Sequence, residues 1–78
     1  MAEQGSDRER IRGVLDTMTD TLRIPLVLRD MDGFSYEEVA ATLGIGLSAV
    51  KMRIKRAREE FRSRYEALLD QESTRVAS

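Results

Sequence analysis

The side chains best suited to specific chemistry lie in one short stretch, residues 48–58. Serine can donate or accept a hydrogen bond at a DNA base edge, lysine can reach guanine acceptors, and alanine or methionine can touch a thymine methyl group. Basic side chains also bind phosphates, which positions a protein on DNA without reading its sequence. The base-contact candidates are Ser48, Ala49, Met52 and Lys55, and the phosphate-contact candidates are Lys51, Arg53, Arg56 and Arg58.

Positive charge is concentrated in the same stretch, although the net charge of the chain is −1. Between Lys51 and Arg64 there are seven basic and two acidic residues, so this window carries +5 and the remainder −6. A charged helix face is usually only solvated, and an ion pair with Glu59 or Glu66 is an equal alternative for Arg58. We expect the acidic remainder to weaken non-specific DNA binding, which is dominated by charge.

Enzyme chemistry finds little support. The chain has no histidine and no cysteine, which removes the commonest general base and the commonest metal ligands. The carboxylates of Glu37–Glu38 and Glu59–Glu60 are adjacent in sequence, so on a helix they point about 100° apart. Gly44-Ile45-Gly46 lacks the third glycine and the strand of a phosphate-binding loop. We therefore expect no enzymatic activity, no metal, no cofactor and no small-molecule substrate.

Two helices separated by a glycine turn must position these side chains. Ser35 is a plausible N-cap with Glu38 three residues later, which is the pattern of a capping box. The backbone N–H groups of Ser35 and Tyr36 at this helix start are further candidates for a phosphate contact. Gly44 suits the left-handed position that ends such a helix.

The second helix of this pair is expected to begin near Leu47 or Ser48 and to have two distinct faces. Helical spacing places one apolar set on a common side and one polar set opposite. A short capped helix, a glycine turn and a basic outward face are typical of the helix-turn-helix, whose second helix enters the major groove. The apolar set is Val50, Ile54, Ala57 and Phe61, and the opposite set is Ser48, Met52, Lys55 and Glu59.

Before this pair, two further helices are expected. Apolar residues at helical spacing between Ile11 and Met18 predict the first. The second follows Thr19 and ends at Gly33, and Pro25 leaves two alternatives open. Either the helix contains Pro25 and its first turns are irregular, or it starts near Ile24 with Pro25 in its first turn.

These elements predict one all-α domain. The 78 residues suffice for a single domain, here residues 10–70, with mobile tails at 1–9 and 71–78. The last helix is expected to run to about Asp70 or to break once near Arg62. No stretch has the apolar length of a membrane span or a signal peptide, so we expect no membrane partner and a cytoplasmic location.

The motifs now in view resemble region four of bacterial sigma factors, specifically the extracytoplasmic-function group. The resemblance covers roughly residues 15–69 and rests on the separation of two runs, Tyr36-Glu37-Glu38 and Val50-Lys51-Met52-Arg53. It implies a four-helix domain that recognises the −35 promoter element and docks on the β-subunit flap of RNA polymerase through an apolar groove. It also implies possible masking by an anti-sigma factor. By position, Ser48, Ala49, Lys51, Met52 and Lys55 would approach DNA, with Arg53 and Arg56 nearer phosphates.

Three positions depart from the family pattern. Met18-Thr19 replaces a leucine-proline pair, Ala49 replaces a common threonine, and Met52 replaces a frequent serine. Base preference is therefore expected to differ from the family norm. The chain also lacks the domain that binds the −10 element, so it is either an excised domain or a stand-alone region-four-like protein.

Two alternatives to promoter recognition remain. The first is a protein-interaction module with little DNA binding, in which apolar helix surfaces contact polymerase or an anti-sigma factor. The second is the DNA-binding domain of a response regulator, whose helix-turn-helix is similar. The candidate partner-binding residues are Leu15, Leu22, Leu26 and Phe61.

Overall fold

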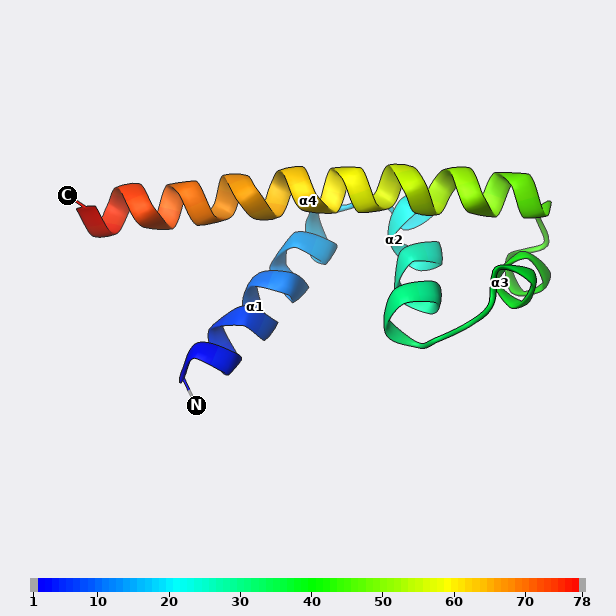
Figure 1. Cartoon of the computed structure of the whole chain (residues 1–78), viewed down its shortest axis with the longest axis horizontal. Coiled ribbons are helices and arrows are strands. Elements are labelled where there is room, and N and C mark those ends of the chain that lie inside the picture. The colour runs from blue at the N-terminus through cyan, green and yellow to red at the C-terminus, as the bar shows by residue number, and fades with distance from the viewer. Residues whose placement is uncertain (1, 78) are drawn as a thin grey trace.

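The computed structural model describes the backbone of residues 2–77 and the side chains of residues 7–73. This part of the chain is helical and contains no strand (Figure 1). With η1 taken as a π-helical continuation of α2, it forms the four-helix, all-α domain that the sequence predicts. The elements are α1 (Ala2–Thr17), α2 (Asp20–Leu26), η1 (Val27–Met31), α3 (Tyr36–Leu43) and α4 (Leu47–Ala77).

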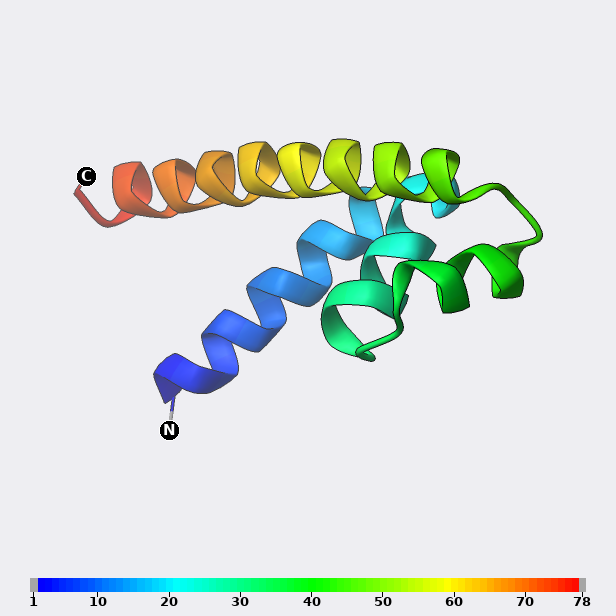
Figure 2. The same cartoon turned by 45° about the vertical axis from the view of Figure 1, so that its right-hand side comes forward.

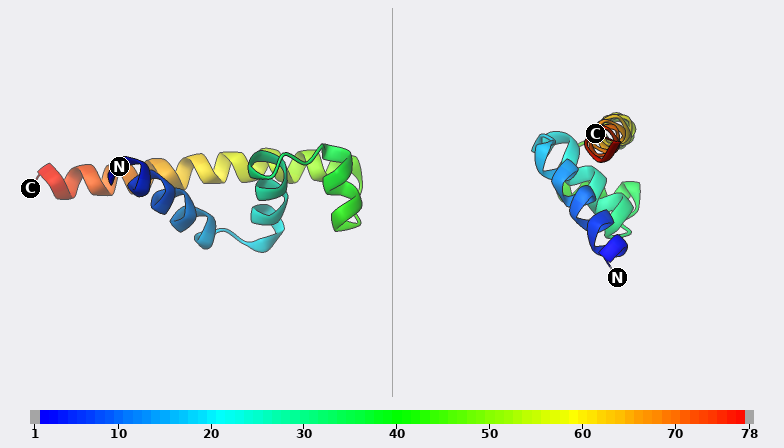
Figure 3. Two further views of the ribbon diagram at one scale, coloured as in Figure 1. Left: turned by 90° about the horizontal axis from the view of Figure 1, so that it is seen from below. Right: turned by 90° about the vertical axis from the view of Figure 1, so that its left-hand side faces the viewer.

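Helix α4 spans the molecule, whose dimensions are 48 × 24 × 14 Å. Its 31 residues extend about 46 Å at the usual rise of an α-helix. It begins at Leu47, as predicted, and does not break near Arg62. The end-on view in Figure 3 shows that the other helices all lie to one side of α4. The opposite side of α4 is therefore left uncovered.

Two hydrophobic clusters attach the other helices to α4. In the first, Met18 and Leu26 pack on Ala57, and all three are at most 6 % exposed. In the second, Val39 of α3 packs between Val50 and Ile54 of α4, and all three are at most 1 % exposed. The buried face of α4 is thus the one that helical spacing predicts. Partly buried neighbours of these clusters include Leu15, Leu22 and Phe61 in the first and Leu28, Phe34, Tyr36, Ala40, Leu43 and Ile45 in the second.

The turn between α3 and α4 is visible at one end of the molecule in Figure 2. Helix α3 ends at Gly44, whose φ of 69° is the left-handed conformation expected there. The N–H groups of Gly44 and Ile45 both donate to the carbonyl of Ala40, at 2.8 and 3.1 Å. These bonds close the end of α3 and turn the chain directly into α4.

Pro25 lies inside α2, which settles the alternatives left open by the sequence. The helix begins at Asp20, after Thr19 in an extended conformation, so a start near Ile24 is wrong. The irregularity follows Pro25 rather than preceding it. It is the π-helical segment η1, in which the Asp32 N–H donates to the carbonyl of Val27 at 3.0 Å. A left-handed Gly33, φ 79°, then ends the helix as predicted.

Helical structure extends into both stretches that the sequence predicts as tails. Helix α1 begins at Ala2 and α4 ends at Ala77. Within the predicted C-terminal tail, Glu72 is bound by Arg10, with Nη2 and Oε1 2.7 Å apart. Local composition did not reveal this pair because its members are 62 residues apart in sequence. The boundaries of the folded domain at 10 and 70 remain a prediction.

Candidate nucleic-acid interface

The uncovered side of α4 carries the side chains predicted to meet base edges. Ser48, Met52 and Lys55 are all exposed, and the Met52 side chain is 56 % exposed. They face away from the buried Val50 and Ile54, which hold this part of the helix in place. A shallow groove of about 510 Å³ runs along this side, lined by Ser48, Lys51, Met52, Lys55, Arg56 and Glu59.

Two of the predicted residues in the first turns of α4 lie off this groove. Ala49 and Arg53 are half-buried on the flank of α4 and do not line it. Glu59 lies in it, at the end farthest along the helix from Ser48. A carboxylate repels phosphate, so Glu59 limits how far along α4 a DNA backbone can approach. The structure thus brings together five of the predicted residues and one acidic neighbour.

The start of α3 forms the predicted capping box. The Glu38 N–H donates to Ser35 Oγ at 3.0 Å, and the Ser35 N–H donates to Glu38 Oε1 at 2.8 Å. The backbone hydrogen bond from Ser35 holds the pKa of the Glu38 carboxyl below its usual value, and the serine side chain contributes further. Ser35 is therefore not a free backbone donor, contrary to the sequence-based expectation. Tyr36 is the first helical residue, where an N–H has no partner within the helix.

The Tyr36 ring lies between two cations. The Arg29 guanidinium lies 4.6 Å from the ring centroid and the Lys51 ammonium 5.9 Å from it, within the range of cation–π attraction. Arg29 also donates from Nη1 to the Phe34 carbonyl at 2.9 Å. Sequence analysis missed Arg29, because no local pattern connects it with Tyr36. This stack links η1, the start of α3 and the start of α4.

Arg58, a predicted phosphate contact, is paired with a carboxylate of the domain itself. It donates from Nε and Nη2 to the two carboxylate oxygens of Asp30, at 2.8 and 2.6 Å. Neither Glu59 nor Glu66 is its partner, because Asp30 of η1 lies closer once the helices are packed. The hydrogen bond from Arg58 lowers the pKa of Asp30, and the Arg58 charge adds to the effect.

The predicted partner-binding residues form the first core cluster rather than a surface. Leu26 is only 6 % exposed, so it offers almost no contact area to a partner. Leu15, Leu22 and Phe61 are half-buried around it. Leu26 is covered within the domain itself, because spacing identifies an apolar face but not what already covers it.

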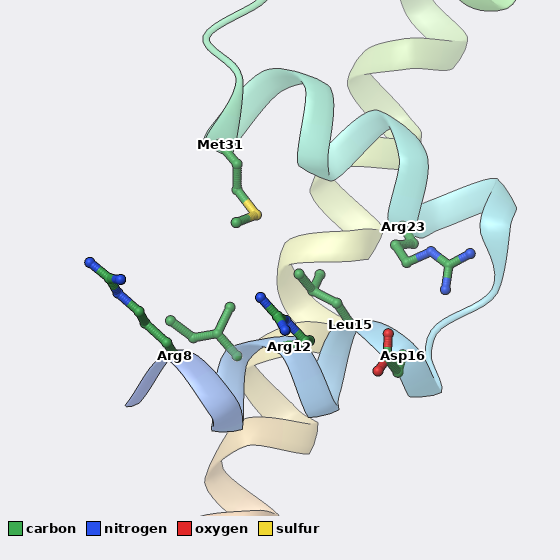
Figure 4. A pocket seen from close by; sticks show the side chains of 7 residues that line it. Arg8, Arg12, Leu15, Asp16, Arg23 and Met31 are labelled. Atoms are coloured by element: carbon green, nitrogen blue, oxygen red, sulfur yellow. The ribbon is translucent and has the colours of Figure 1, made fainter. Parts of the chain in front are cut away.

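A second groove, of about 420 Å³, lies beside that cluster between α1 and the α2–η1 segment. Figure 4 shows Leu15 and Met31 directed into it, with Arg8, Arg12 and Arg23 around its edge. Met31 is 60 % exposed. Ile11 and Asp16 complete the lining. Of the predicted partner-binding residues, only Leu15 reaches this groove.

Other kinds of site find no support in the part of the chain that the structure describes. No three histidine, cysteine or carboxylate side chains among residues 7–73 group so as to hold a metal ion. None of the described helices combines the length and apolar character needed to cross a membrane.

Comparison with known proteins gives consistent matches. The family model for sigma-70, region 4, matches residues 8–61. The chain is 42 % identical over 52 residues to the ECF RNA polymerase sigma factor SigE of Mycolicibacterium smegmatis, covering 67 % of the chain and 20 % of that protein. It is 34 % identical over 62 residues to the ECF RNA polymerase sigma-E factors of Escherichia coli and Salmonella typhimurium, covering 80 % of the chain and 32 % of each. The chain thus spans about a fifth to a third of these relatives.

Proposed function

Since the chain belongs to the sigma-70 region 4 family, in its extracytoplasmic-function group, we propose that it recognises the −35 element of promoters. The family is a DNA-binding helix-turn-helix domain with a promoter-binding role in transcription initiation, and it is not enzymatic. The predicted family and the predicted absence of an enzymatic role are thereby confirmed. The same match rejects the response-regulator alternative.

The observation that supports promoter recognition is the uncovered face of α4. The exposed Ser48, Met52 and Lys55 lie along a single groove, and a helix presented this way fits the DNA major groove. Lys55 would hydrogen-bond guanine acceptors, Ser48 would bond either kind of base edge, and Met52 or Ala49 would touch thymine methyls. Lys51, Arg53 and Arg56 would bind phosphates on either side, together with the Tyr36 N–H.

Docking on RNA polymerase is the second part of the proposal. The groove between α1 and α2–η1 has an apolar base and an arginine edge, which suits an amphipathic helix with acidic flanks. We assign it to the β-subunit flap, and to an anti-sigma factor as a competitor for the same surface. A protein that works with polymerase on the chromosome would be cytoplasmic. The folded unit, residues 10–70, would carry both surfaces except for Arg8 at the edge of the second groove.

The alternative function is a protein-interaction module with little DNA binding. Two observations favour it: Glu59 lies in the groove on α4, and the net charge is −1. Both reduce attraction to a DNA backbone. The two functions differ in which groove carries the binding.

Fluorescence anisotropy against a library of −35-like duplexes, repeated at several salt concentrations, tests the proposal. We expect one sequence to bind well above random DNA. The triple substitution of Lys51, Lys55 and Arg56 by alanine should reduce the salt slope by about 1.8, which is about 0.9 for each of the phosphate contacts of Lys51 and Arg56, and it should also remove the base contact of Lys55. Arg8, Arg12 and Arg23, substituted together, provide the matched control with the same charge change on the other groove.

Three results are informative. Loss of DNA binding in the α4 triple variant alone supports promoter recognition. Equal losses in both triple variants mean that binding follows overall charge, which contradicts it. Equal binding of all duplexes by the unchanged chain, vanishing with salt, leaves the protein-interaction module as the function.

A further inference from the structure

A basic stripe runs along one flank of α4, and its first two members also line the groove described above. Its members are spaced four, three and four residues apart, which keeps them on one side of a helix. From the first to the last it extends about 16 Å, at about 1.5 Å per residue. The members are Lys51, Lys55, Arg58 and Arg62.

One member of this stripe differs from the others. Arg58 forms a two-pronged pair with Asp30 of η1, whereas no carboxylate among residues 7–73 forms an ion pair with the other three. In the absence of DNA, both carboxylate oxygens of Asp30 therefore already bind the Arg58 guanidinium and balance its charge. The Asp30 carboxylate is ionised at neutral pH like any ordinary aspartate, and the hydrogen bond from Arg58 lowers its pKa further.

A contribution to folding stability does not by itself explain the pair between Arg58 and Asp30. Its side chains are 46 % and 35 % exposed, and exposed ion pairs contribute little to folding. Helix α4 is already fixed beside this point by Ile54 and Ala57, which are at most 1 % exposed. The larger physical effect of Asp30 is on the charge that the stripe presents to solvent.

Building on the proposed promoter recognition, we propose that Asp30 is a specificity-determining residue that holds Arg58 away from the DNA backbone. Non-specific affinity grows with each phosphate that a protein neutralises, and it carries no sequence information. Occupying Arg58 removes one such contact while leaving Ser48, Met52 and Lys55 free at the base edges. On a random duplex no base contacts fix the position of α4, so a released Arg58 is free to reach a phosphate, whereas on the preferred duplex the base contacts fix where Arg58 lies. Pairing Arg58 with Asp30 therefore lowers non-specific binding more than specific binding.

The test is Asp30→Asn, which keeps the shape of the side chain and removes its charge. Anisotropy titrations of the chain against its preferred duplex and a random duplex, over a range of salt concentrations, should show a salt slope steeper by about 0.9. Affinity for the random duplex should rise more than affinity for the preferred one. Asp32→Asn is the matched control: Asp32 is exposed, and its substitution changes the net charge equally without releasing Arg58.

A second variant keeps the test decisive. Arg58→Gln should leave the salt slope of the unchanged chain intact, because Arg58 contacts no phosphate there. Asp30→Asn combined with Arg58→Gln should also behave like the unchanged chain, whose net charge it shares. A slope that falls by about 0.9 in Arg58→Gln means that Arg58 already contacts DNA, which overturns the inference. Equal slopes in Asp30→Asn and Asp32→Asn overturn it as well. If the unchanged chain binds no duplex at all, the proposed function itself has failed, and the inference fails with it.

Discussion

The two halves of α4 are parts of one continuous helix, yet they are held very differently. Residues 47–61 include Val50, Ile54 and Ala57, all at most 1 % exposed and packed against α2 and α3. Residues 62–73 include no buried residue, and their long-range polar contact is the partly buried pair of Arg10 with Glu72. The match to the family model also ends at residue 61.

This difference shows where rigidity is needed. A helix that presents side chains to base edges must keep its rotation and position, and buried apolar contacts fix both more firmly than exposed ion pairs. Three experiments follow, taken here from the largest expected effect to the smallest.

The largest effect is expected from Ile54→Ala in the first half. Removing a fully buried side chain leaves a cavity and should lower the free energy of unfolding by about 2–4 kcal/mol. Leu69→Ala is the matched control in the second half: Leu69 is 39 % exposed, and the loss should stay below about 1 kcal/mol. Urea unfolding followed by circular dichroism measures both. Equal losses would mean that the second half is packed as firmly as the first.

A smaller effect is expected from Ser35→Ala, which opens the capping box of α3 and loosens its packing on the first half. Loss of an N-cap should cost about 1 kcal/mol. Ser63→Ala makes the same chemical change at an exposed position in the second half and should stay within about 0.5 kcal/mol. Thermal unfolding compares the two variants. If Ser35→Ala is as stable as Ser63→Ala, the capping box does not contribute measurably to the stability of the fold.

The smallest effect is expected from acid. The pKa values of Asp30 and Glu38 are both lowered, by hydrogen bonds from Arg58 and Ser35 respectively. A carboxyl whose pKa is lowered on folding stabilises the folded state above its unfolded pKa, and this contribution is lost as the pH falls below about 4. Melting temperatures between pH 3 and 6 should therefore fall toward acid, and Asp30→Asn should reduce the change. If the melting temperature of Asp30→Asn depends on pH in the same way as that of the unchanged chain, Asp30 does not contribute to the loss of stability in acid.

The features that the sequence predicted well are the local ones. The capping box joins residues three positions apart, the Gly44 turn depends on one left-handed backbone, and the buried face of α4 follows from helical spacing. Each depends on neighbours within about one turn of helix, so the order of residues encodes it directly. The outward face of Ser48, Met52 and Lys55 follows from the same periodicity.

The features that the sequence could not give depend on how helices are placed against one another. Asp30 and Arg58 are 28 residues apart, so their pairing requires η1 to pack beside the middle of α4. The same packing puts Arg29 on the Tyr36 ring and covers Leu26, which the sequence offered as a partner-binding candidate.

By itself, the sequence therefore determined that this protein is a helix-turn-helix domain with a basic outward face, because periodicity, caps and turns act over short distances. Only the tertiary structure decided which of the basic side chains remain free on that face. Charges are neutralised through space, and the partner of a charge is set by the packing of elements that lie far apart in the chain.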